Sequence, residues 1–355
     1  MNSQAESVIA RRKALAQALE IAAASKPTSG YADDFDAYDT GEIVGLKRLK
    51  LYDMEVLVKS ISGLKEEARE FAKKMQRSGS WRTLTPVPDN YQKICKALAE
   101  EFPNFSGYID EYLLPSLSIG HLCDSCFILP PTVFVGPPGL GKTLFVSKLS
   151  KVFGLDFERL NLETAQASFE VIGTATGWSN STPGLIYRWL SRVKSSNGIL
   201  VMEELDKCSP DSRYSVLNVL IQLLEPTTSV AVADKSHPEL KLDLSKLSYL
   251  FTANSLVGIS APILSRLLVV DIPELTPAQA KRVALNQYEA LIYSLNLPIA
   301  APRLTEHGLM VLSEESPRRQ RLLMQMALGR AIAEKSNELT ITPTQKTSGP
   351  KMGFF

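Results

Sequence analysis

The chain has 355 residues, of which 45% are apolar and 22% charged. This is ordinary globular composition, and it excludes a mainly disordered chain, a collagen-like fibre or a disulfide scaffold. The net charge of +1, from 39 basic and 38 acidic residues, gives no overall attraction to nucleic acid or an anionic membrane. The N-terminus lacks a signal-like apolar run, and no stretch approaches the roughly 18 apolar residues of a membrane span. With only four cysteines, these features predict a cytoplasmic protein without a membrane span.

Residues 1–85 are predicted to form a helical extension. Residues 7–24 are rich in helix formers, and residues 26–40 combine Pro, Gly and acids with aromatic residues. The second stretch is interpreted as a solvated linker or as a docking segment that orders on a partner. A heptad stripe predicts one long helix over residues 42–76, which either packs in a helix hairpin or forms a coiled coil between subunits. The stripe consists of Leu57, Ile61, Leu64, Ala68, Phe71 and Met75.

From residue 131 to 273, short aliphatic runs alternate with helical segments. The runs predict strands at 132–135, 198–202, 247–253 and 267–272. Such alternation is typical of βαβ units, so we expect an α/β fold with a covered parallel sheet. After residue 276 the pattern is helical, with segments at 277–295, 306–313 and 317–337.

A phosphate-binding loop follows the first of these strands. Residues 136–143 read GPPGLGKT, which fits the eight-residue pattern between a strand and a helix. Glycines let successive backbone N–H groups face the phosphates, and the positive end of the following helix dipole points at the same anion. The lysine adds a positive charge for the phosphates, and the threonine offers a hydroxyl to Mg²⁺. The order of strand, loop and helix argues against a chance Gly-Pro turn. The candidate nucleotide-binding residues are Gly136, Pro137, Pro138, Gly139, Leu140, Gly141, Lys142, Thr143 and Leu144.

A second strand ends in carboxylates, in the sequence GILVMEELDK at 198–207. Glu203 is expected to hold Mg²⁺ through water, and Glu204 to polarise the attacking water. Most phosphate-loop ATPases have Asp at the first position. Glutamate carries its charge one methylene further out, which leaves the rate of hydrolysis open. Simple solvent exposure of two acids is the alternative interpretation.

Together these segments resemble a known family. GPPGLGKT, ILVMEELDK, LFTAN and ILSRL, followed by helices, occur in the order found in AAA+ ATPases. The ATPase module of Lon proteases is the most similar, since it reads DEIDK where this chain reads EELDK and shares the runs at 243–246 and 223–226. The resemblance covers about residues 120–335. It implies an AAA+ P-loop αβα core over 86–275 and a C-terminal helical lid over 276–345, with ATP and Mg²⁺ as cofactors. The sequence of the C-terminus separately predicts a disordered tail over 346–355.

The resemblance also assigns roles to single residues. Asn254 matches the first sensor, which positions the attacking water. Arg266 matches the arginine finger, which acts in the neighbouring subunit, and Asp206 matches an acid near the subunit interface. Arg318 is the best match to the second sensor in the lid, with Arg319 and Arg321 as competitors. A solvated basic face is the alternative for these last three.

A further segment bears on the substrate. Lon has a loop with an aromatic residue that faces the central channel, and its match over residues 173–184 is Trp178. Polar neighbours favour this pore position over a core tryptophan. Lon continues into a protease domain, which is expected to be absent here because the chain ends at Phe355.

His121, Cys123 and Cys126 give only three of the four ligands that a structural zinc site needs. Within the family resemblance, the stretch 119–121 is expected instead to line the adenine pocket.

The predicted function is an ATP-binding and ATP-hydrolysing homo-oligomeric ring, a hexamer, which remodels or threads a protein substrate or partner protein. The first alternative is a nucleotide-controlled assembly switch with weak hydrolysis, which Glu203 favours. The second is a ring that acts on nucleic acid through basic clusters such as Arg318, Arg319 and Arg321.

Overall fold

A computed structural model describes residues 42–43, 46–123, 126–163, 168–175, 181–208, 216–295 and 300–342. The chain divides into two compact units. Of the described residues, the first unit comprises those up to 100, within 105–136 and within 142–272, and the second comprises 101–104, 137–141 and those from 273 onward. Among the described helices, none is both long and apolar enough to cross a membrane.

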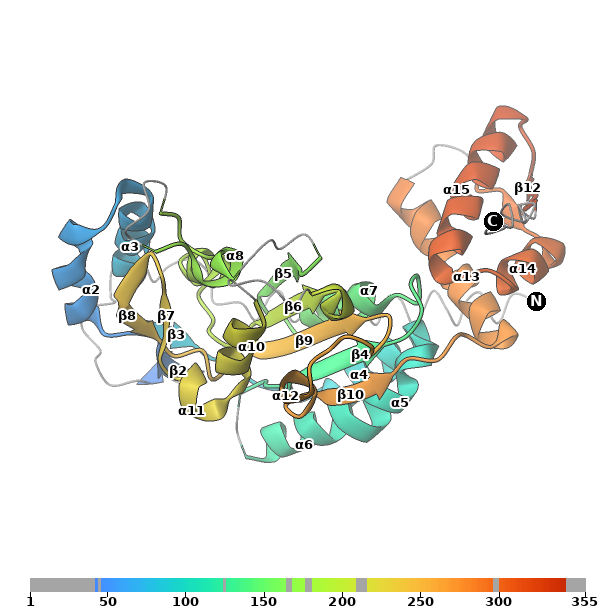
Figure 1. The fold of residues 1–355 in the computed structure, drawn as a ribbon. Coiled ribbons are helices and arrows are strands. Elements are labelled where there is room, and N and C mark those ends of the chain that lie inside the picture. The colour runs from blue at the N-terminus through green and yellow to red at the C-terminus, as the bar shows by residue number, and fades with distance from the viewer. Residues whose placement is uncertain are drawn as a thin grey trace, which may run out of the picture. The chain divides into compact units, whose positions relative to one another are not determined.

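The first unit is built on a five-stranded parallel sheet in the order β10-β4-β9-β6-β5 (Figure 1). Four strands confirm the sequence prediction: β4 (Thr132–Val135), β6 (Ile199–Glu203), β9 (Ser248–Ala253) and β10 (Leu268–Asp271). The fifth, β5 (Phe157–Asn161), was not predicted, because its sequence FERLN has little apolar character. It lies at a sheet edge, where alternate residues reach solvent and a polar composition is tolerated.

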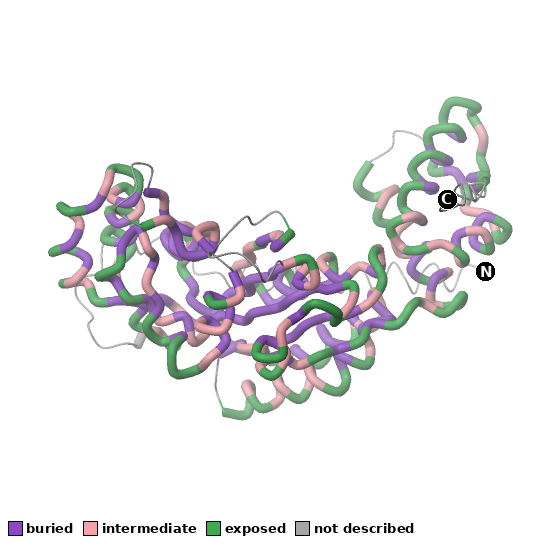
Figure 2. Tube along the Cα trace, in the orientation of Figure 1, coloured by how far each residue is buried: buried purple, intermediate pink, exposed green. Residues whose placement is uncertain are grey.

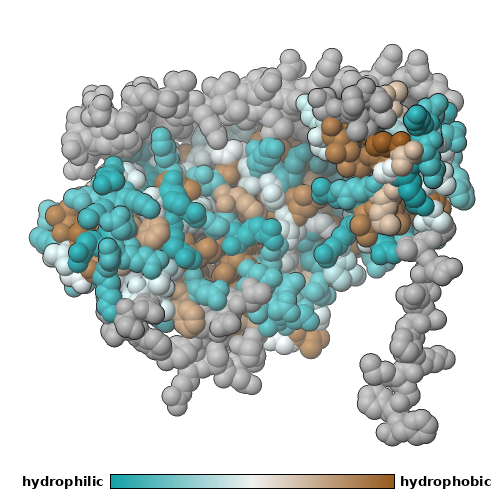
Figure 3. Space-filling view, turned by 90° about the horizontal axis from the view of Figure 1, so that it is seen from above, coloured by the Kyte–Doolittle hydropathy of each residue, from teal (hydrophilic) through white to brown (hydrophobic). Residues whose placement is uncertain are grey.

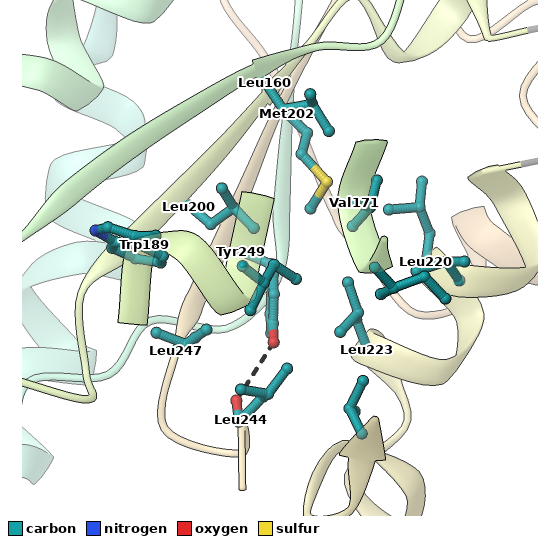
Figure 4. Packing of buried hydrophobic residues seen from close by; sticks show 14 of the residues in the cluster. Leu160, Val171, Trp189, Leu200, Met202, Leu220, Leu223, Leu244, Leu247 and Tyr249 are labelled. Atoms are coloured by element: carbon teal, nitrogen blue, oxygen red, sulfur yellow. Dashed lines mark hydrogen bonds between the residues drawn. The ribbon is translucent and has the colours of Figure 1, made fainter. Parts of the chain in front are cut away.

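Apolar side chains cover both faces of this sheet, which confirms the α/β prediction. On one face, Val133 and Val135 belong to a large buried cluster that also includes Leu220. Figure 4 shows strand residues of this cluster facing helical ones. On the other face, Phe134 lies against Phe105 and Phe145, whose rings stack at 4.1 Å. Figure 2 shows the same strands as the most continuously buried part of the unit.

The helices of the first unit that follow the phosphate loop are mostly short. They are α7 (Lys142–Val152), α8 (Phe169–Ile172), α9 (Leu185–Leu190), the 3₁₀ turn η4 (Leu205–Lys207), α10 (Val216–Leu224), α11 (Pro226–Ser229) and α12 (Ala261–Leu264).

The predicted single helix over residues 42–76 is wrong. The segment contains strands β1 (Glu42–Ile43) and β2 (Leu46–Lys50), then α2 (Met54–Ser60), the 3₁₀ turn η1 (Ile61–Gly63) and α3 (Glu66–Ser78). The backbone becomes extended at Leu64 and Lys65, directly after Gly63, which is a weak helix former. β2 also pairs with β3 (Trp81–Thr83), which draws its residues into a small antiparallel sheet.

The heptad stripe itself is buried within the chain. Leu57, Leu64, Ala68 and Met75 belong to the main hydrophobic cluster, and Ile61 and Phe71 pack against it. The stripe therefore reflects packing of the helices within the chain, as in the predicted hairpin, and not a coiled coil between subunits.

A helical stretch leads from this region to β4. It consists of α4 (Tyr91–Glu101), the 3₁₀ turn η2 (Pro103–Phe105), α5 (Ser106–Tyr108), the π-helical turn η3 (Ile109–Leu113) and α6 (Leu114–Leu122). Pro103 begins the 3₁₀ turn that follows α4, and Pro115 lies in the first turn of α6, directly after the π-helical turn.

The second unit is mainly helical, as predicted. It contains α13 (Pro277–Leu295), α14 (Glu306–Ser313) and α15 (Pro317–Ala333), with two short paired strands, β11 (Arg303–Leu304) and β12 (Glu338–Leu339). Buried Gln320 ties them together, because its side-chain amide donates to Ala280 O and Leu312 O. Apolar side chains also reach the surface of this unit (Figure 3), among them Leu285, Tyr293, Met310, Leu322 and Met326.

A hairpin of β7 (Val232–Asp234) and β8 (His237–Leu242) contacts the described segments that flank Trp178 in the sequence. Residues 176–180, Trp178 included, lie outside the described residues. Below them, buried Asp234 accepts from Gly184 N at 2.8 Å and from Ser236 N and Oγ. Thr174 N donates to Thr182 O at 3.0 Å. One carboxylate thus fixes both the hairpin turn and one stem of the loop, and the two stems pair with each other.

A buried histidine joins this hairpin to the N-terminal segment. His237 Nε2 lies 2.6 Å from Ser60 Oγ in α2, and Nδ1 lies 2.9 Å from the hydroxyl of Tyr187 in α9. A neutral ring satisfies both contacts if Nε2–H donates to Ser60 and Tyr187 donates to Nδ1. Burial lowers the pKa of His237 to about 4.

This histidine makes stability depend on pH. Its folded-state pKa lies below the unfolded value of about 6.5, so its contribution is present above pH 6.5 and is lost as pH falls toward 4. We expect a loss on the order of 2 kcal/mol, discounted for solvent screening. The test is denaturant unfolding of the wild type and His237→Gln at several pH values. The difference between their free energies of unfolding should shrink as pH falls. The same change at exposed His307 is the control, and a constant difference for His237 contradicts the assignment.

The stem of the loop should be sensitive to small additions of volume. A β-carbon on Gly184 would lie closer than 3.0 Å to backbone atoms of Val171, Ile172 and Gly173. Gly184→Ala should therefore lower the free energy of unfolding by about 2 kcal/mol or more. Gly107→Ala is the control, since Gly107 is helical with no atom within 4 Å of the added carbon, and it should be neutral or stabilising by up to about 1 kcal/mol. Equal effects of the two variants in denaturant titrations would refute the close approach.

Candidate active site

The phosphate loop connects the end of β4 to the start of α7. Gly136, Gly139 and Gly141 have φ values of 154°, 88° and 87°, which side-chain-bearing residues rarely adopt. The loop is anchored at its start, where Gly136 N donates to Ala253 O at 3.2 Å. Glycine is thus required at three positions of the predicted motif, and the loop has the curled backbone that phosphate binding needs.

Lys142 is the first residue of α7, and only 9% of its surface is exposed. Its ammonium group donates to Gly136 O and to Asn254 Oδ1, the latter at 3.3 Å. Burial lowers the pKa of Lys142, while the charges of Asp206 and Glu204 act in the opposite direction. The structure therefore brings the predicted phosphate lysine together with the predicted sensor asparagine.

Thr143 and Glu203 meet in the same place. The Thr143 hydroxyl donates to Glu203 Oε1, and Arg159 Nη2 lies 2.6 Å from Glu203 Oε2. Each oxygen of Glu203 thus has a partner, and the side chain is 11% exposed. Arg159 lies on β5 and was not predicted, because that strand was not recognised.

Glu204 follows β6 with left-handed backbone angles of φ 62° and ψ 47°. This conformation is costly for a residue other than glycine, and its N–H donates to Thr252 Oγ1 at 3.3 Å. Hydrogen bonding with the Glu163 carboxyl raises the pKa of Glu204, and burial and the charges of Glu163, Asp206 and Glu203 add to this. Glu163 was also missed in the sequence.

These residues fit a nucleotide with Mg²⁺. Among the described residues, Glu204 Oε2 and Asp206 Oδ1 are buried without a hydrogen-bond partner. Buried carboxylate oxygens next to a threonine hydroxyl and a buried lysine form a set of hard oxygen donors with a cation for phosphate. When bound, Mg²⁺ would neutralise phosphate charge at this place.

Arg266 follows α12 and pairs within its own chain. Its Nη2 and Nε atoms lie 3.0 Å and 3.2 Å from Glu225 Oε2, and Nη1 donates to Pro262 O at 2.9 Å. Glu225 is the single residue between α10 and α11 and the N-cap of α11. Its ion pair with Arg266 was not predicted from the sequence. The predicted finger is therefore oriented by a carboxylate outside the acidic group at β6.

In the second unit, Arg318 lies in the first turn of α15, after the N-cap Ser316. A β-carbon on Gly139 would lie 3.4 Å from Ser316 Oγ and 3.6 Å from the β-carbon of Arg318. Within the second unit, Arg318 therefore lies close to Gly139. Its competitors Arg319 and Arg321 are not among the nearest neighbours of Gly139.

The residues that are expected to line the adenine pocket lie away from the phosphate loop. Ile119 and Gly120 line a cavity of about 340 Å³ together with Ile128, which precedes β4 and lies at the strand end opposite the phosphate loop. Instead, Asn104 Nδ2 donates to Leu140 O at 3.2 Å, and the Phe102 ring lies 4.0 Å from a β-carbon placed on Gly141.

The possible metal ligands near this cavity do not converge. Within the described part of the chain, no three His, Cys, Asp or Glu side chains cluster as metal ligands. Cys123 is exposed and Cys126 is buried, while His121 lies against Tyr91 with ring centroids 5.3 Å apart.

Comparison with known proteins agrees with this geometry. Residues 132–272 match the family described as "ATPase family associated with various cellular activities (AAA)". A "Lon protease homolog 2, peroxisomal" from Zea mays is 31% identical over 157 residues, 44% of this chain and 18% of the relative. A "Lon protease" from Heliobacterium modesticaldum is 30% identical over 194 residues, 54% of this chain and 22% of the relative.

A "Lon protease" from Metamycoplasma arthritidis is 29% identical over 189 residues, 53% of this chain and 22% of the relative. The match thus spans about a fifth of the length of these curated relatives. The family match lies on the five-stranded sheet and includes the phosphate loop, the acidic strand end and Asn254. Residues 132–272 of this chain are therefore similar to AAA ATPases, and about half of the chain is similar to Lon proteases.

Proposed function

We propose that the chain binds ATP with Mg²⁺ and hydrolyses it as one subunit of a homo-oligomeric ring. The observation that carries this proposal is the convergence of Lys142, Thr143, Glu203 and Asn254 through direct contacts. Lys142 and the loop N–H groups hold the phosphates, while Thr143 and, through water, Glu203 hold the metal ion. Phe102 and Asn104, beside the loop, are proposed to face the base.

Glu204 is proposed as the general base. It follows β6 directly, and its raised pKa makes the carboxylate a stronger acceptor for a proton from the attacking water. Asn254, held 3.3 Å from the Lys142 ammonium, is placed to orient that water beside the terminal phosphate. Arg318, beside Gly139, is proposed to contact the phosphates from the lid.

The oligomer is proposed to be a hexamer in which Arg266 completes the site of the neighbouring subunit. The ion pair between Arg266 and Glu225 supports this role. It holds the guanidinium group away from the carboxylates that follow β6 in the same chain, so the arginine is proposed to contact the nucleotide of another subunit. Exposed apolar side chains on the second unit, such as Leu322 and Met326, offer surface for assembly. A cytoplasmic location stays a prediction from the sequence.

Glu204→Gln should lower ATP turnover by at least about 100-fold while ATP binding is retained, since the amide keeps the shape but cannot accept the proton. Phosphate release and equilibrium binding of a fluorescent ATP analogue measure the two effects. Glu239→Gln, an exposed change on β8, is the control and should leave both unchanged. Wild-type turnover in the Glu204 variant would exclude this residue as the base.

We further propose that the ring threads a protein substrate, with Trp178 as the aromatic grip. The relatives named as proteases and the braced stems at Thr174 and Thr182 support this proposal. The second candidate is an assembly switch with weak hydrolysis. It is favoured by Glu203, whose carboxylate lies one methylene further out than that of the aspartate found in most phosphate-loop ATPases.

Substrate stimulation should distinguish these functions. An unfolded protein should accelerate ATP turnover if the ring threads protein. DNA should accelerate it if the ring acts on nucleic acid. Neither should accelerate it if the protein is an assembly switch. Trp178→Ala should keep basal turnover and lose the stimulation and the unfolding of a tagged substrate, because the aromatic contact is removed. Trp178→Tyr is the matched control and should retain both. Full unfolding by the alanine variant would exclude Trp178 as the grip.

A further inference from the structure

The ion pair between Arg159 and Glu203 is the strongest unexplained interaction near the site. The nitrogen–oxygen distance is 2.6 Å, and the carboxylate is largely shielded from water. A short charge-assisted bond to a shielded carboxylate is much stronger than an exposed pair. The roles proposed above for the nucleotide site do not use Arg159.

The backbone places this arginine accurately. β5 pairs with β6 in parallel, with Asn161 opposite Glu203 in the register and Leu162 N donating to Glu203 O at 2.9 Å. Arg159 therefore lies two residues before the position opposite Glu203, within reach of its side chain. Figure 1 shows β5 directly beside β6 at the edge of the sheet.

Glutamate needs such a partner more than aspartate would. Its additional methylene adds one rotatable bond, so the carboxylate can take more positions and loses more entropy when it is held. In this structure Arg159 binds Oε2 and leaves Oε1 to the Thr143 hydroxyl. The second oxygen is thereby turned toward the threonine that is proposed to serve the metal ion.

We propose that Arg159 is a positioning residue, which holds the longer Glu203 side chain in the orientation that serves Mg²⁺. This inference rests on the proposed nucleotide function and deepens it. Arg159 acts only through Glu203, and its partner oxygen is the one that does not contact Thr143.

The chain contains a matched control. Arg192 Nη2 also lies 2.6 Å from a glutamate oxygen, that of Glu158, and both arginine side chains are 57% exposed. Glu158 and Arg159 are neighbours on β5, so their side chains point to opposite faces of the strand. Arg192 thus forms a similar pair on the same strand without contact to Glu203.

The experiment titrates Mg²⁺ into the full chain with a fluorescent, non-hydrolysable ATP analogue and measures its binding. Arg159→Gln should raise the half-saturating Mg²⁺ concentration by about 10-fold, the usual effect of losing a residue that orients a metal ligand. Arg192→Gln should leave it unchanged. Loss of positive charge alone would favour Mg²⁺ binding, so a weaker affinity reports positioning.

A second pair of variants excludes a merely structural role. Aspartate at position 203 withdraws the carboxylate from Arg159 by one methylene, so Arg159→Gln should have a smaller effect in the Glu203→Asp background. Arg159→Lys should recover part of the affinity, since a lysine keeps the charge but not the planar donor geometry. Equal effects of Arg159→Gln in both backgrounds would overturn the proposal.

The outcomes also separate the two proposals. If the wild type binds the analogue with Mg²⁺ and Arg159→Gln does so equally well, only the positioning role fails. If the wild type binds no nucleotide, the proposed function fails, and the role of Arg159 fails with it.

Discussion

The site depends above all on the parallel register of three neighbouring strands. β4, β9 and β6 pair so that Val135 lies opposite Ala253 and Met202 opposite Phe251. Their carboxyl ends therefore meet at one edge of the sheet, and the residues that follow them emerge together. Each strand contributes one component there: the phosphate loop, the asparagine and the carboxylates. A shift of one strand by a single residue would turn its side chains to the other face and separate these components.

Local sequence patterns predicted those parts of the fold whose determinants are short. The phosphate loop, four strands and the three helices of the second unit have apolar or glycine patterns that act within a few residues. β5 has no such pattern, because only its pairing with β6 makes FERLN a strand. The stripe from Leu57 to Met75 correctly predicted which side chains are buried, but it wrongly predicted one continuous helix. The pairing of β2 with β3 and the extended residues after Gly63 determine where the helices begin and end.

The candidate site shows the same division. Lys142, Thr143, Glu203 and Asn254 follow from motifs, and the structure brings them together. The partners that orient them could not be predicted from spacing, since Arg159 on the neighbouring strand is 44 positions from Glu203 and Glu225 is 41 positions from Arg266. Sequence patterns thus identify the groups that perform the chemistry more easily than those that hold them in place.

The junction at Asp234 has a consequence for variation in this chain. One carboxylate accepts from Gly184 at a loop stem and from Ser236 in the hairpin turn. Burial raises the pKa of Asp234 to about 6, so the junction retains its charge at neutral pH only because these donors compensate for the lost water. Asp234 thus couples the segment at Gly184 to the hairpin turn at Ser236, so a substitution that disturbs one of these places also disturbs the other.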